Sequence, residues 1–436
     1  MNSFLKRRVV ELAAITASVV LLTPCSAFGE GCGLPNEKPS TFGFSPERLQ
    51  KLDRNMQAII DRKTVAGTVT LLARHGKVIG CKAYGYQDVS SAKPMQVNSI
   101  FRIFSMTKPI TGVAMMILYE EGKWQPTDPV EKYIPELAKL KVFAGTDSNG
   151  NMILEDPKHP PTIGELLTHT AGFTYGLFGN TPVDKLYKES NLFASTSLTE
   201  FVEKVGKLPL LYQPGEEWVY SVSVDIQGLL VERLSGKPFA DFMRERIFNP
   251  LGMKDTDFLV PEQKLARLVT LYSADATGAM KAEAADSLYA KPLSFPSGGG
   301  GLFSTAADYL RFCQMLLNGG ELNGVRILAP SSVQLMRANH LPDRLLTGTY
   351  GIAGYYMQPG LGFGYDVAVY TDPLEVGNTA GEGSFFWLGI AGTWFWIDPT
   401  NDVIFVGMTQ RFEFIPGVRQ MRALSRSLTY QALVRP

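Results

Sequence analysis

Apolar positions after Ser45 repeat every three or four residues, which is the spacing of one face of an α-helix. These positions are Leu49, Leu52, Met56, Ile59 and Ile60. Ser45 is a residue type that caps helix N-termini, and Pro46 suits the first helical turn. The pattern predicts an amphipathic helix that begins at Pro46 and covers a core with its apolar face.

The next segment changes to the pattern of β-strands. TVTLLARHGKVIGCKAYGYQDV is rich in strand-forming residues around the turn pair His75-Gly76, so it predicts two strands joined by a tight turn. The polar stretch SSAKPMQVNS contains a proline and predicts a connection. After FRIFS, the strongly apolar PITGVAMMILYEEG predicts a buried helix.

The remainder of the chain divides into a helical part and a β part. Helix patterns and proline-rich loops dominate from about residue 126 to 290, whereas FGYDVAVYT, SFFWLGIAGTWFWIDP and NDVIFVGMTQRF predict strands. A final helix is expected from about Val418 to Val434. We therefore expect an α/β (α+β) fold, with an antiparallel sheet flanked by helices from both chain ends.

We expect one domain over about residues 40–436. In it, an α/β lobe of about residues 40–125 and 290–436 would carry an inserted, mostly helical lobe at about 126–290. Two lobes that share one cleft fit this length better than two independent domains.

The first 29 residues follow a different pattern. The basic segment LKRR precedes the apolar run LAAITASVVLL, and small residues follow, which is typical of a secretory signal peptide. We expect cleavage after Ala27 or Gly29, and hence a secreted or periplasmic protein with no stable membrane span after signal removal. A lipoprotein anchored through Cys25 is disfavoured, because Pro24 directly precedes the cysteine.

Composition changes the picture in two ways. The 42 Lys+Arg balance the 42 Asp+Glu, which gives no reason to expect binding to nucleic acid or to an anionic membrane surface. Of the cysteines left after signal removal, Cys32 and Cys81 could form a disulfide in an oxidising compartment. Cys313 lies in the helical pattern YLRFCQMLLNGG and is expected to be buried.

Candidate chemistry begins with the two Ser-x-x-Lys matches that lie beyond the predicted signal peptide, Ser105–Lys108 and Ser90–Lys93. A chain of this length contains about one or two such matches by chance. Ser90 and Lys93 fall in the polar connection, which is typical of a turn. Ser105 instead starts the buried helix, with Lys108 one turn on and on the same face. Burial would lower the pKa of Lys108 and allow it to act as a base for Ser105.

Other catalytic patterns are absent from the sequence. It contains no Gly-x-Ser-x-Gly elbow and no paired-histidine zinc motif, and His169 at a helix end is interpreted as a structural residue. Residues 147–151 resemble a calcium loop only briefly, and we expect a turn. The glycines at 298–301 are interpreted as a backbone turn, because no phosphate-binding Lys-Ser/Thr follows.

Five longer motifs follow one another along the chain: FRIFSMTKPITG, LLTHTAG, QPGEEWVYSVSVDIQGLLVERLSG, SGGGGLFSTAADYLRF and GSFFWLGIAGTWFWIDP. Together they resemble the serine β-lactamase superfamily, on the branch with class C β-lactamases, DD-peptidases and family VIII carboxylesterases. The resemblance implies that Ser105 is the nucleophile, Lys108 the general base and Tyr220 the proton relay. It also implies that the backbone N–H groups of Ser105 and Ile390 form an oxyanion hole, the latter on an edge strand.

The departures from this resemblance concern the substrate pocket. β-Lactamases of this branch have Asn where this chain has Val222, and Lys-Thr-Gly where it has Trp387, Leu388 and Gly389. The first change implies the loss of an amide that holds a lactam substrate, and the second the loss of a cation that meets its carboxylate. The tryptophan at position 387 resembles that of the family VIII esterases, which usually have the sequence Trp-Gly-Gly in this motif. Leu388 should therefore narrow the pocket or make it more apolar, although Trp387 and Leu388 also suit plain packing in a strand.

From these residues we expect an exported serine hydrolase that cleaves small carboxylic esters through a Ser-Lys-Tyr acyl-enzyme, with no metal or organic cofactor. A β-lactamase, a D-amino-acid peptidase or amidase, and a transacylase of the same fold are the alternatives. A binding module with an inactive site is a further alternative.

Overall fold

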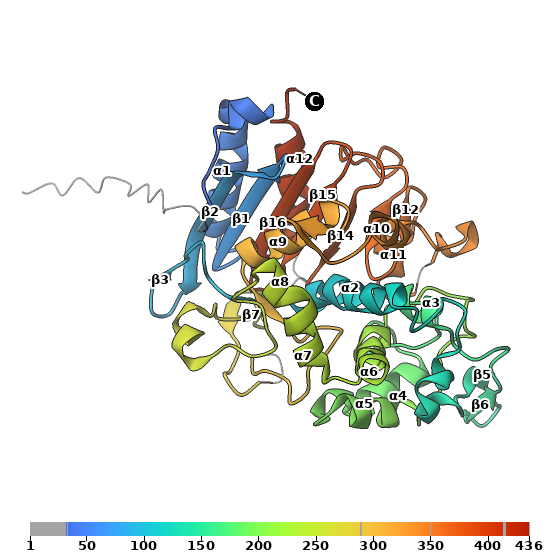
Figure 1. Cartoon of the computed structure of the whole chain (residues 1–436). Helices are drawn as coiled ribbons and strands as arrows, with labels where there is room; N and C mark the ends of the chain where they lie inside the picture. Colours follow the sequence, from blue (N-terminus) through green and yellow to red (C-terminus); the bar gives the residue numbers. More distant parts are fainter. Residues whose placement is uncertain (1–31, 33, 288–289, 349, 413–415, 436) are drawn as a thin grey trace, which may run out of the picture.

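A computed structural model describes residues 32, 34–287, 290–348, 350–412 and 416–435. It has an α/β part built around one sheet and a helical part beside it (Figure 1). The predicted signal peptide, with Cys25, lies outside the described residues.

One antiparallel sheet forms the centre of the α/β part. Its strands are β1 (Gly67–Arg74), β2 (Lys77–Asp88), β3 (Lys93–Pro94), β12 (Leu361–Phe363), β13 (Ala368–Tyr370), β14 (Phe385–Leu388), β15 (Trp394–Asp398) and β16 (Val403–Thr409). Their order is β12-β13-β14-β15-β16-β1-β2-β3. Because β1 pairs with both β2 and β16, strands from the two ends of the chain lie side by side in the middle of the sheet.

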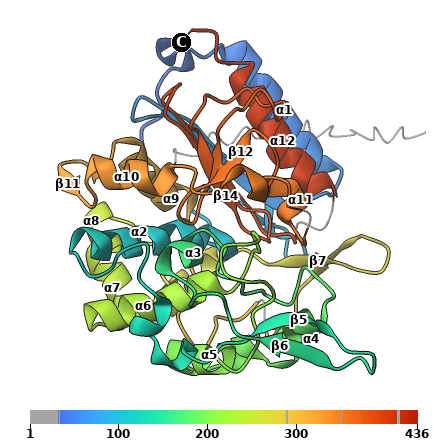
Figure 2. The same cartoon turned by 90° about the vertical axis from the view of Figure 1, so that its right-hand side faces the viewer.

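Helices cover both faces of this sheet, as the sequence predicts. Helices α1 (Pro46–Asp61) and α12 (Pro416–Tyr430) lie side by side on one face (Figure 2). Helix α9 (Ala306–Leu317) packs on β1, β15 and β16 from the other. The predicted cap of α1 is confirmed, because Ser45 Oγ accepts a hydrogen bond from the Arg48 N–H at 3.2 Å.

The final helix is shorter than predicted and ends at Tyr430 instead of near Val434. The residues beyond it bind the segment that precedes α1. The Ala432 carbonyl accepts from the Ser45 N–H at 2.8 Å, and the Val434 N–H donates to the Gly43 carbonyl at 2.9 Å. These backbone groups are satisfied by the other chain end, so they do not continue the helix.

Helix α2 (Thr107–Glu120) separates the two parts. Every residue from Thr107 to Leu118 is buried, because the helix contacts α6 (Ser223–Ser235) on one side and α10 (Pro330–Arg337) on another. Figure 1 shows it running between the sheet and the helical part. The predicted buried helix after FRIFS is thus confirmed.

The helical part contains α6 and several shorter helices. These are α3 (Ile163–Leu167), α4 (Pro182–Glu189), α5 (Leu198–Val205), α7 (Phe239–Met243) and α8 (Asn249–Leu251). Helix α11 (Ala353–Tyr356) belongs to the α/β part. Four strand pairs complete the described chain: β4 (Phe101–Arg102) with β9 (Phe303–Ser304), β5 (Val142–Thr146) with β6 (Met152–Glu155), β7 (Tyr272–Ala274) with β8 (Met280–Ala282), and β10 (Glu321–Leu322) with β11 (Val325–Arg326). None of these four pairs was predicted from the sequence.

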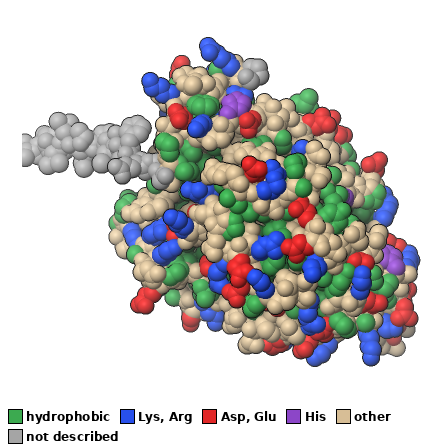
Figure 3. Space-filling view, in the orientation of Figure 1, with side chains coloured by type: hydrophobic (Ala, Val, Ile, Leu, Met, Phe, Trp, Pro, Cys, Tyr) green, Lys and Arg blue, Asp and Glu red, His purple; other side chains and the backbone are tan. Residues whose placement is uncertain are grey.

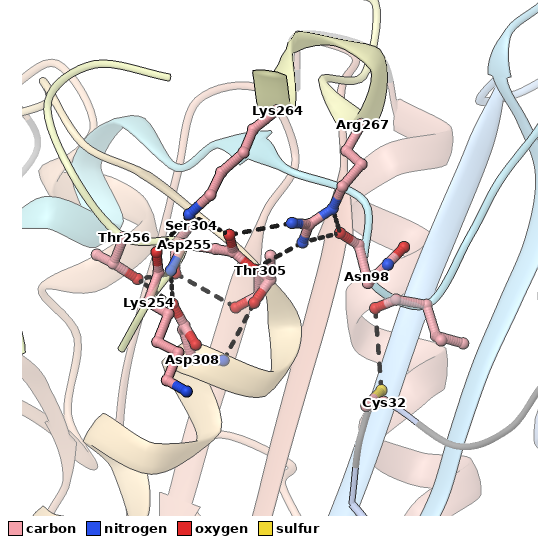
Figure 4. Close-up of polar contacts among 11 residues, drawn as sticks. Cys32, Asn98, Lys254, Asp255, Thr256, Lys264, Arg267, Ser304, Thr305 and Asp308 are labelled. Atoms are coloured by element: carbon pink, nitrogen blue, oxygen red, sulfur yellow. Dashed lines mark hydrogen bonds and ion pairs between the residues drawn. The ribbon is translucent and has the colours of Figure 1, made fainter. Parts of the chain in front are cut away.

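A polar joint ties the end of the helical part to α9 (Figure 4). The Asp308 carboxylate accepts from the Asp255 N–H at 2.6 Å and from Thr256 Oγ1 at 3.1 Å. Asp255 in turn pairs with Arg267 at 2.7 Å, and Arg267 Nε donates to the Asn98 carbonyl at 2.9 Å. Asn98 lies shortly before Ser105, so this joint also fixes the chain that leads to the predicted nucleophile.

The cysteines and the surface follow the sequence expectations. Cys32 and Cys81 form a disulfide, and Cys313 is a buried free thiol. Figure 3 shows acidic and basic side chains interspersed over one face of the molecule. Within the described ranges, the helices are all too short or too polar to cross a bilayer.

Candidate active site

Ser105 follows a tight turn of the chain. After β4 pairs with β9, Phe104 adopts a φ of +43°. A non-glycine residue rarely takes this left-handed conformation, and such residues concentrate at functional sites. Ser105 lies in the 3-10 turn Phe104–Met106, which leads directly into α2, and its side chain lines a cavity.

Lys108 lies one turn further along α2 and is fully buried. Its Nζ is 3.1 Å from Ser105 Oγ and donates to the Gly299 carbonyl oxygen at 2.6 Å. Desolvation lowers the pKa of Lys108 to about 8, although the nearby carboxyl groups of Asp225 and Asp366 oppose this shift. An ordinary lysine stays protonated to about pH 10, whereas Lys108 becomes a neutral proton acceptor near pH 8.

The hydroxyl of Tyr220 reaches the same place from the segment before α6. Tyr220 interacts through its side chain with Ser105, and its hydroxyl accepts a hydrogen bond from Trp387 Nε1 at 3.3 Å. Lys108 Nζ lies 4.6 Å from the centroid of the Tyr220 ring. Burial raises the pKa of Tyr220, so the phenol carries its proton and can donate it. The structure therefore brings together the three residues predicted to be catalytic.

The third motif lies on β14, which is an edge strand over only half of its length. Phe385 and Phe386 pair with β13 on one side and β15 on the other, whereas Trp387 and Leu388 pair with β15 alone. The predicted edge is thus corrected to the second half of β14, because β13 is too short to cover it.

The end of β14 approaches the chain just before Ser105. A Cβ atom at Gly389 would lie 2.3 Å from the Ile103 carbonyl oxygen, so only glycine allows this contact. Ile390 follows at the cavity, and its N–H donates to none of the residues that the structure describes. That N–H is available to a substrate oxygen, as the predicted oxyanion hole requires.

The cavity in front of Ser105 has a volume of about 900 Å³. Apolar and aromatic side chains dominate its lining, among them Phe104, Tyr175, Phe178, Phe193, Tyr356, Trp387 and Leu388. Its charged lining residues are all basic: Arg102, Lys188, Lys291 and Arg419. A substrate carboxylate could therefore meet one of these basic side chains, although the chain lacks the lysine that β-lactamases of this branch have in the third motif.

Two of the residues predicted for the substrate pocket do not line the cavity. Val222 is fully buried at the N-terminus of α6, and Gly389 packs on Ile103. Trp387 and Leu388 do line the cavity, and Trp387 also holds the Tyr220 hydroxyl. Trp387 is therefore more than a packing residue of its strand.

The second Ser-x-x-Lys match does not form a pair. Ser90 Oγ donates to Asp88 at 2.6 Å, and Lys93 Nζ donates to the Ala266 carbonyl. Both lie in the connection around β3, as predicted from turn chemistry.

His169 follows α3 with a φ of +57° and is fully buried, which confirms its predicted place at a helix end. Its ring lies 4.9 Å from that of Tyr220, and burial lowers its pKa well below the usual value. We interpret it as a neutral residue that supports Tyr220. In the described part of the chain, no three His, Cys, Asp or Glu side chains gather where a metal ion could be held.

Sequence reasoning missed three groups around Lys108. The glycine turn at 298–301 supplies a carbonyl to the amine through Gly299, and Asp225 and Asp366 are buried nearby. Asp225 gives a weak signal, since it is a carboxylate between two apolar residues of a helix, Val224 and Ile226. Asp366 gives none, because only the fold brings it to α2.

The chain is similar over most of its length to several known proteins. Protein Rv1367c of Mycobacterium tuberculosis is 35% identical to this chain, over 82% of this chain and 88% of that protein. Esterase EstB of Burkholderia gladioli is 28% identical, over 82% of this chain and 89% of that protein. The solved structure of "EstCE1, a hydrolase with promiscuous acyltransferase activity" superposes with a TM-score of 0.73 at 27% identity, covering 88% of this chain and 98% of that one.

A family assignment rests on a longer match. Residues 52–429 fit the sequence profile of the family described as Beta-lactamase, and this range includes every residue of the site. The chain belongs to the Beta-lactamase family.

Proposed function

We propose that this protein is an exported serine hydrolase that cleaves carboxylic esters through an acyl-enzyme on Ser105. The observation that carries the proposal is the 3.1 Å contact between Ser105 Oγ and a buried lysine amine whose pKa is lowered to about 8. Tyr220 and the N–H of Ile390 stand at the same cavity. The names of EstB and EstCE1, an esterase and a hydrolase, support the same activity.

In the proposed reaction, the Ser105 oxygen forms a bond to the ester carbonyl carbon while its proton passes to Lys108. The N–H groups of Ser105 and Ile390 stabilise the negative oxygen of the tetrahedral intermediate. The bond to the alcohol oxygen then breaks, Tyr220 donates the proton that the alcohol takes away, and Lys108 passes the serine proton to Tyr220, so both groups regain their starting states. Water next attacks the acyl carbon, gives a proton to the same groups and releases the acid, which restores Ser105.

The choice of esters over lactams and peptides depends on the cavity. Its lining is mostly apolar. Position 222 offers no polar side-chain group to a substrate because it is a valine, and Val222 does not line the cavity. A β-lactamase, a D-amino-acid peptidase or amidase and a transacylase remain the alternatives. The basic residues that line the cavity could bind a substrate carboxylate, so the test includes a substrate that carries one.

Activity on esters should exceed activity on a lactam. We expect the wild type to turn over p-nitrophenyl butyrate faster than nitrocefin, and Ser105→Ala to lose at least about a thousandfold in kcat/KM. Ser90→Ala, in the other Ser-x-x-Lys match, is the matched control and should retain wild-type rates. Faster turnover of nitrocefin would reverse the ranking. Absence of both turnover and fluorophosphonate labelling would favour a binding module.

The lowered pKa of Lys108 predicts a pH dependence for the activation of Ser105. Below about pH 8 the amine is protonated and cannot accept the serine proton, so the reaction rate should rise with pH through this value. The measurement is the pH profile of kcat/KM for the best ester. A profile flat between about pH 6 and 9 would contradict Lys108 as the base.

Leu388 should limit the size of the acyl or alcohol group that fits the cavity. Leu388→Gly is expected to raise the ratio of kcat/KM for p-nitrophenyl octanoate over butyrate by about tenfold, because it removes a lining side chain. Leu374→Gly is the control, since Leu374 is 80% exposed and does not line the cavity. An unchanged ratio in Leu388→Gly would show that this side chain does not set chain length.

Export is proposed from the basic and apolar pattern of the first 29 residues. Mass spectrometry of the secreted or periplasmic protein should give a mature N-terminus after Ala27 or Gly29. An unprocessed N-terminus in protein recovered from the cytoplasm would overturn the proposal.

A further inference from the structure

Two carboxyl groups are buried beside the Lys108 amine. The side chains of Asp225 and Asp366 are completely buried, and both attract the charged form of Lys108, Asp225 more strongly. Neither carboxyl forms an ion pair with an arginine or lysine within 4.0 Å in the described chain. Among the described residues, they are the two carboxyl groups that, when ionised, favour the charged form of the Lys108 amine.

Asp225 is connected to Lys108 through Gly299. One oxygen of Asp225 accepts hydrogen bonds from Ser297 Oγ at 2.5 Å and from the Gly299 N–H at 3.1 Å. The carbonyl of the same glycine accepts from Lys108 Nζ at 2.6 Å. A Cβ atom at position 299 would lie 2.5 Å from the other oxygen of Asp225. Asp225 thus fixes the turn whose carbonyl holds the lysine.

Asp366 lies against α2 one turn beyond Lys108. A Cβ atom at Gly112 would be 3.0 Å from one Asp366 oxygen, so the carboxyl group packs directly on the helix. The other oxygen accepts a single hydrogen bond, from Gln227 Nε2 at 3.1 Å. The oxygen that faces Gly112 is buried and accepts from no described residue, and the same holds for the second oxygen of Asp225. The two carboxyls therefore differ in their first oxygen, which accepts two hydrogen bonds in Asp225 and one in Asp366. Asp366 therefore receives less stabilisation as a carboxylate than Asp225 does.

The charges of this cluster decide which carboxyl is ionised. Two carboxylates and one ammonium would leave a net negative charge in a buried region. An uncompensated charge that is not exposed to solvent has an unfavourable free energy. When two acids share such a site, the better stabilised one ionises and the other keeps its proton. Hydrogen bonds to the charged form favour ionisation, and Asp225 accepts two of them from donors that include a hydroxyl. Burial raises the pKa of both groups, and that of Asp366 lies well above its usual value.

We propose that Asp225 is a positioning residue for the Ser105–Lys108 pair, acting as the ionised carboxylate of the cluster, while Asp366 holds a proton and contributes no charge. Asp225 then sets the proton affinity of Lys108 and the place of the Gly299 carbonyl together. The inference rests on the proposed function only in that Lys108 activates Ser105.

The other titratable groups that face this cluster do not change its charge near neutral pH. Burial raises the pKa of Tyr175 well above 10, and that of Tyr220 likewise, so both phenols stay neutral. His169 stays neutral because burial lowers its pKa well below 6.5. A shift in the titration of Lys108 can therefore be traced to the two aspartates.

The test compares Asp225→Asn with its matched control Asp366→Asn, since each replaces one carboxyl by an amide of the same shape. The measurement is the second-order rate of fluorophosphonate labelling of Ser105 as a function of pH, with the modified residue identified by mass spectrometry. This rate reports the activation of the nucleophile and requires no knowledge of the substrate.

Loss of the Asp225 charge should make Lys108 easier to deprotonate. We expect the rise in labelling rate to move to lower pH by about one to three pH units in Asp225→Asn. It should stay within about 0.3 units of wild type in Asp366→Asn, a margin small against the shift from a nearby charge. A purely structural role for Asp225 would lower the maximal rate and leave the midpoint in place, and that result overturns the proposal. Equal shifts in both variants, or a shift in Asp366→Asn alone, also overturn it.

Folding of the variants provides a second check. Asp366→Asn exchanges one neutral group for another and should melt within a few degrees of wild type, so its failure to fold counts against a neutral Asp366. If Asp225→Asn does not fold, the proposal is tested on the wild type by measuring whether Asp366 is protonated. With ¹³C-labelled aspartate carboxyls, the Asp366 resonance, identified by its loss in Asp366→Asn, should keep the shift of a neutral acid at pH 7. A carboxylate shift overturns the proposal.

The outcomes also separate this inference from the proposed function. Labelling of Ser105 with the expected shifts, but no ester turnover, would reject the ester substrate and retain the role of Asp225. Ester turnover, together with labelling midpoints in Asp225→Asn that match wild type, would retain the ester substrate and reject the role of Asp225. Wild-type protein that does not label at Ser105 would overturn both.

Discussion

The structure depends on the burial of one lysine amine. Removing an ammonium group from water costs several kcal/mol unless nearby groups replace the lost hydration. Around Lys108 the replacements are the Gly299 carbonyl, Ser105 Oγ and the face of the Tyr220 ring. A ring face attracts a cation, and a lysine with a lowered pKa accepts protons near neutrality. The same burial that makes Lys108 costly to place thus makes it useful as a base.

The surroundings of the amine come from segments far apart in the sequence, and each is held by the fold rather than by its neighbours in the chain. The turn before Ser105 contains Phe104 at positive φ, a conformation that costs about 1–3 kcal/mol and persists only when the packing around it is firm. The Tyr309 hydroxyl donates to the Met106 carbonyl at 2.9 Å and fixes the other side of that turn. Gly389 allows the end of β14 to touch Ile103. Preorganisation of this kind is what oxyanion stabilisation requires.

Local patterns predicted those elements whose signals are local. Helix α1 has a cap and a periodic face, and the buried helix α2 has an unbroken apolar run, so both were predicted close to their observed limits. The three residues predicted to be catalytic, which the structure brings together, were identified through ordered motifs. The Gly299 carbonyl was missed because a backbone group leaves no mark in the sequence, and Asp366 because its contact with α2 joins distant segments. The predicted placing of Val222 in the pocket was wrong, since a motif position does not fix the direction of a side chain.

Helix α2 has one more consequence, which follows from its place between the sheet and the helical part. It contacts α6 and α7 on one side, while Tyr309 of α9 binds its first turn from the other. Neither part alone encloses the Lys108 amine, and an amine exposed to water returns to its ordinary basicity. The lowered pKa of Lys108 is therefore a property of the completely folded chain. A nascent chain or a proteolytic fragment with one part intact therefore holds the sequence around Ser105 and Lys108 without the enclosure that lowers the pKa of the lysine.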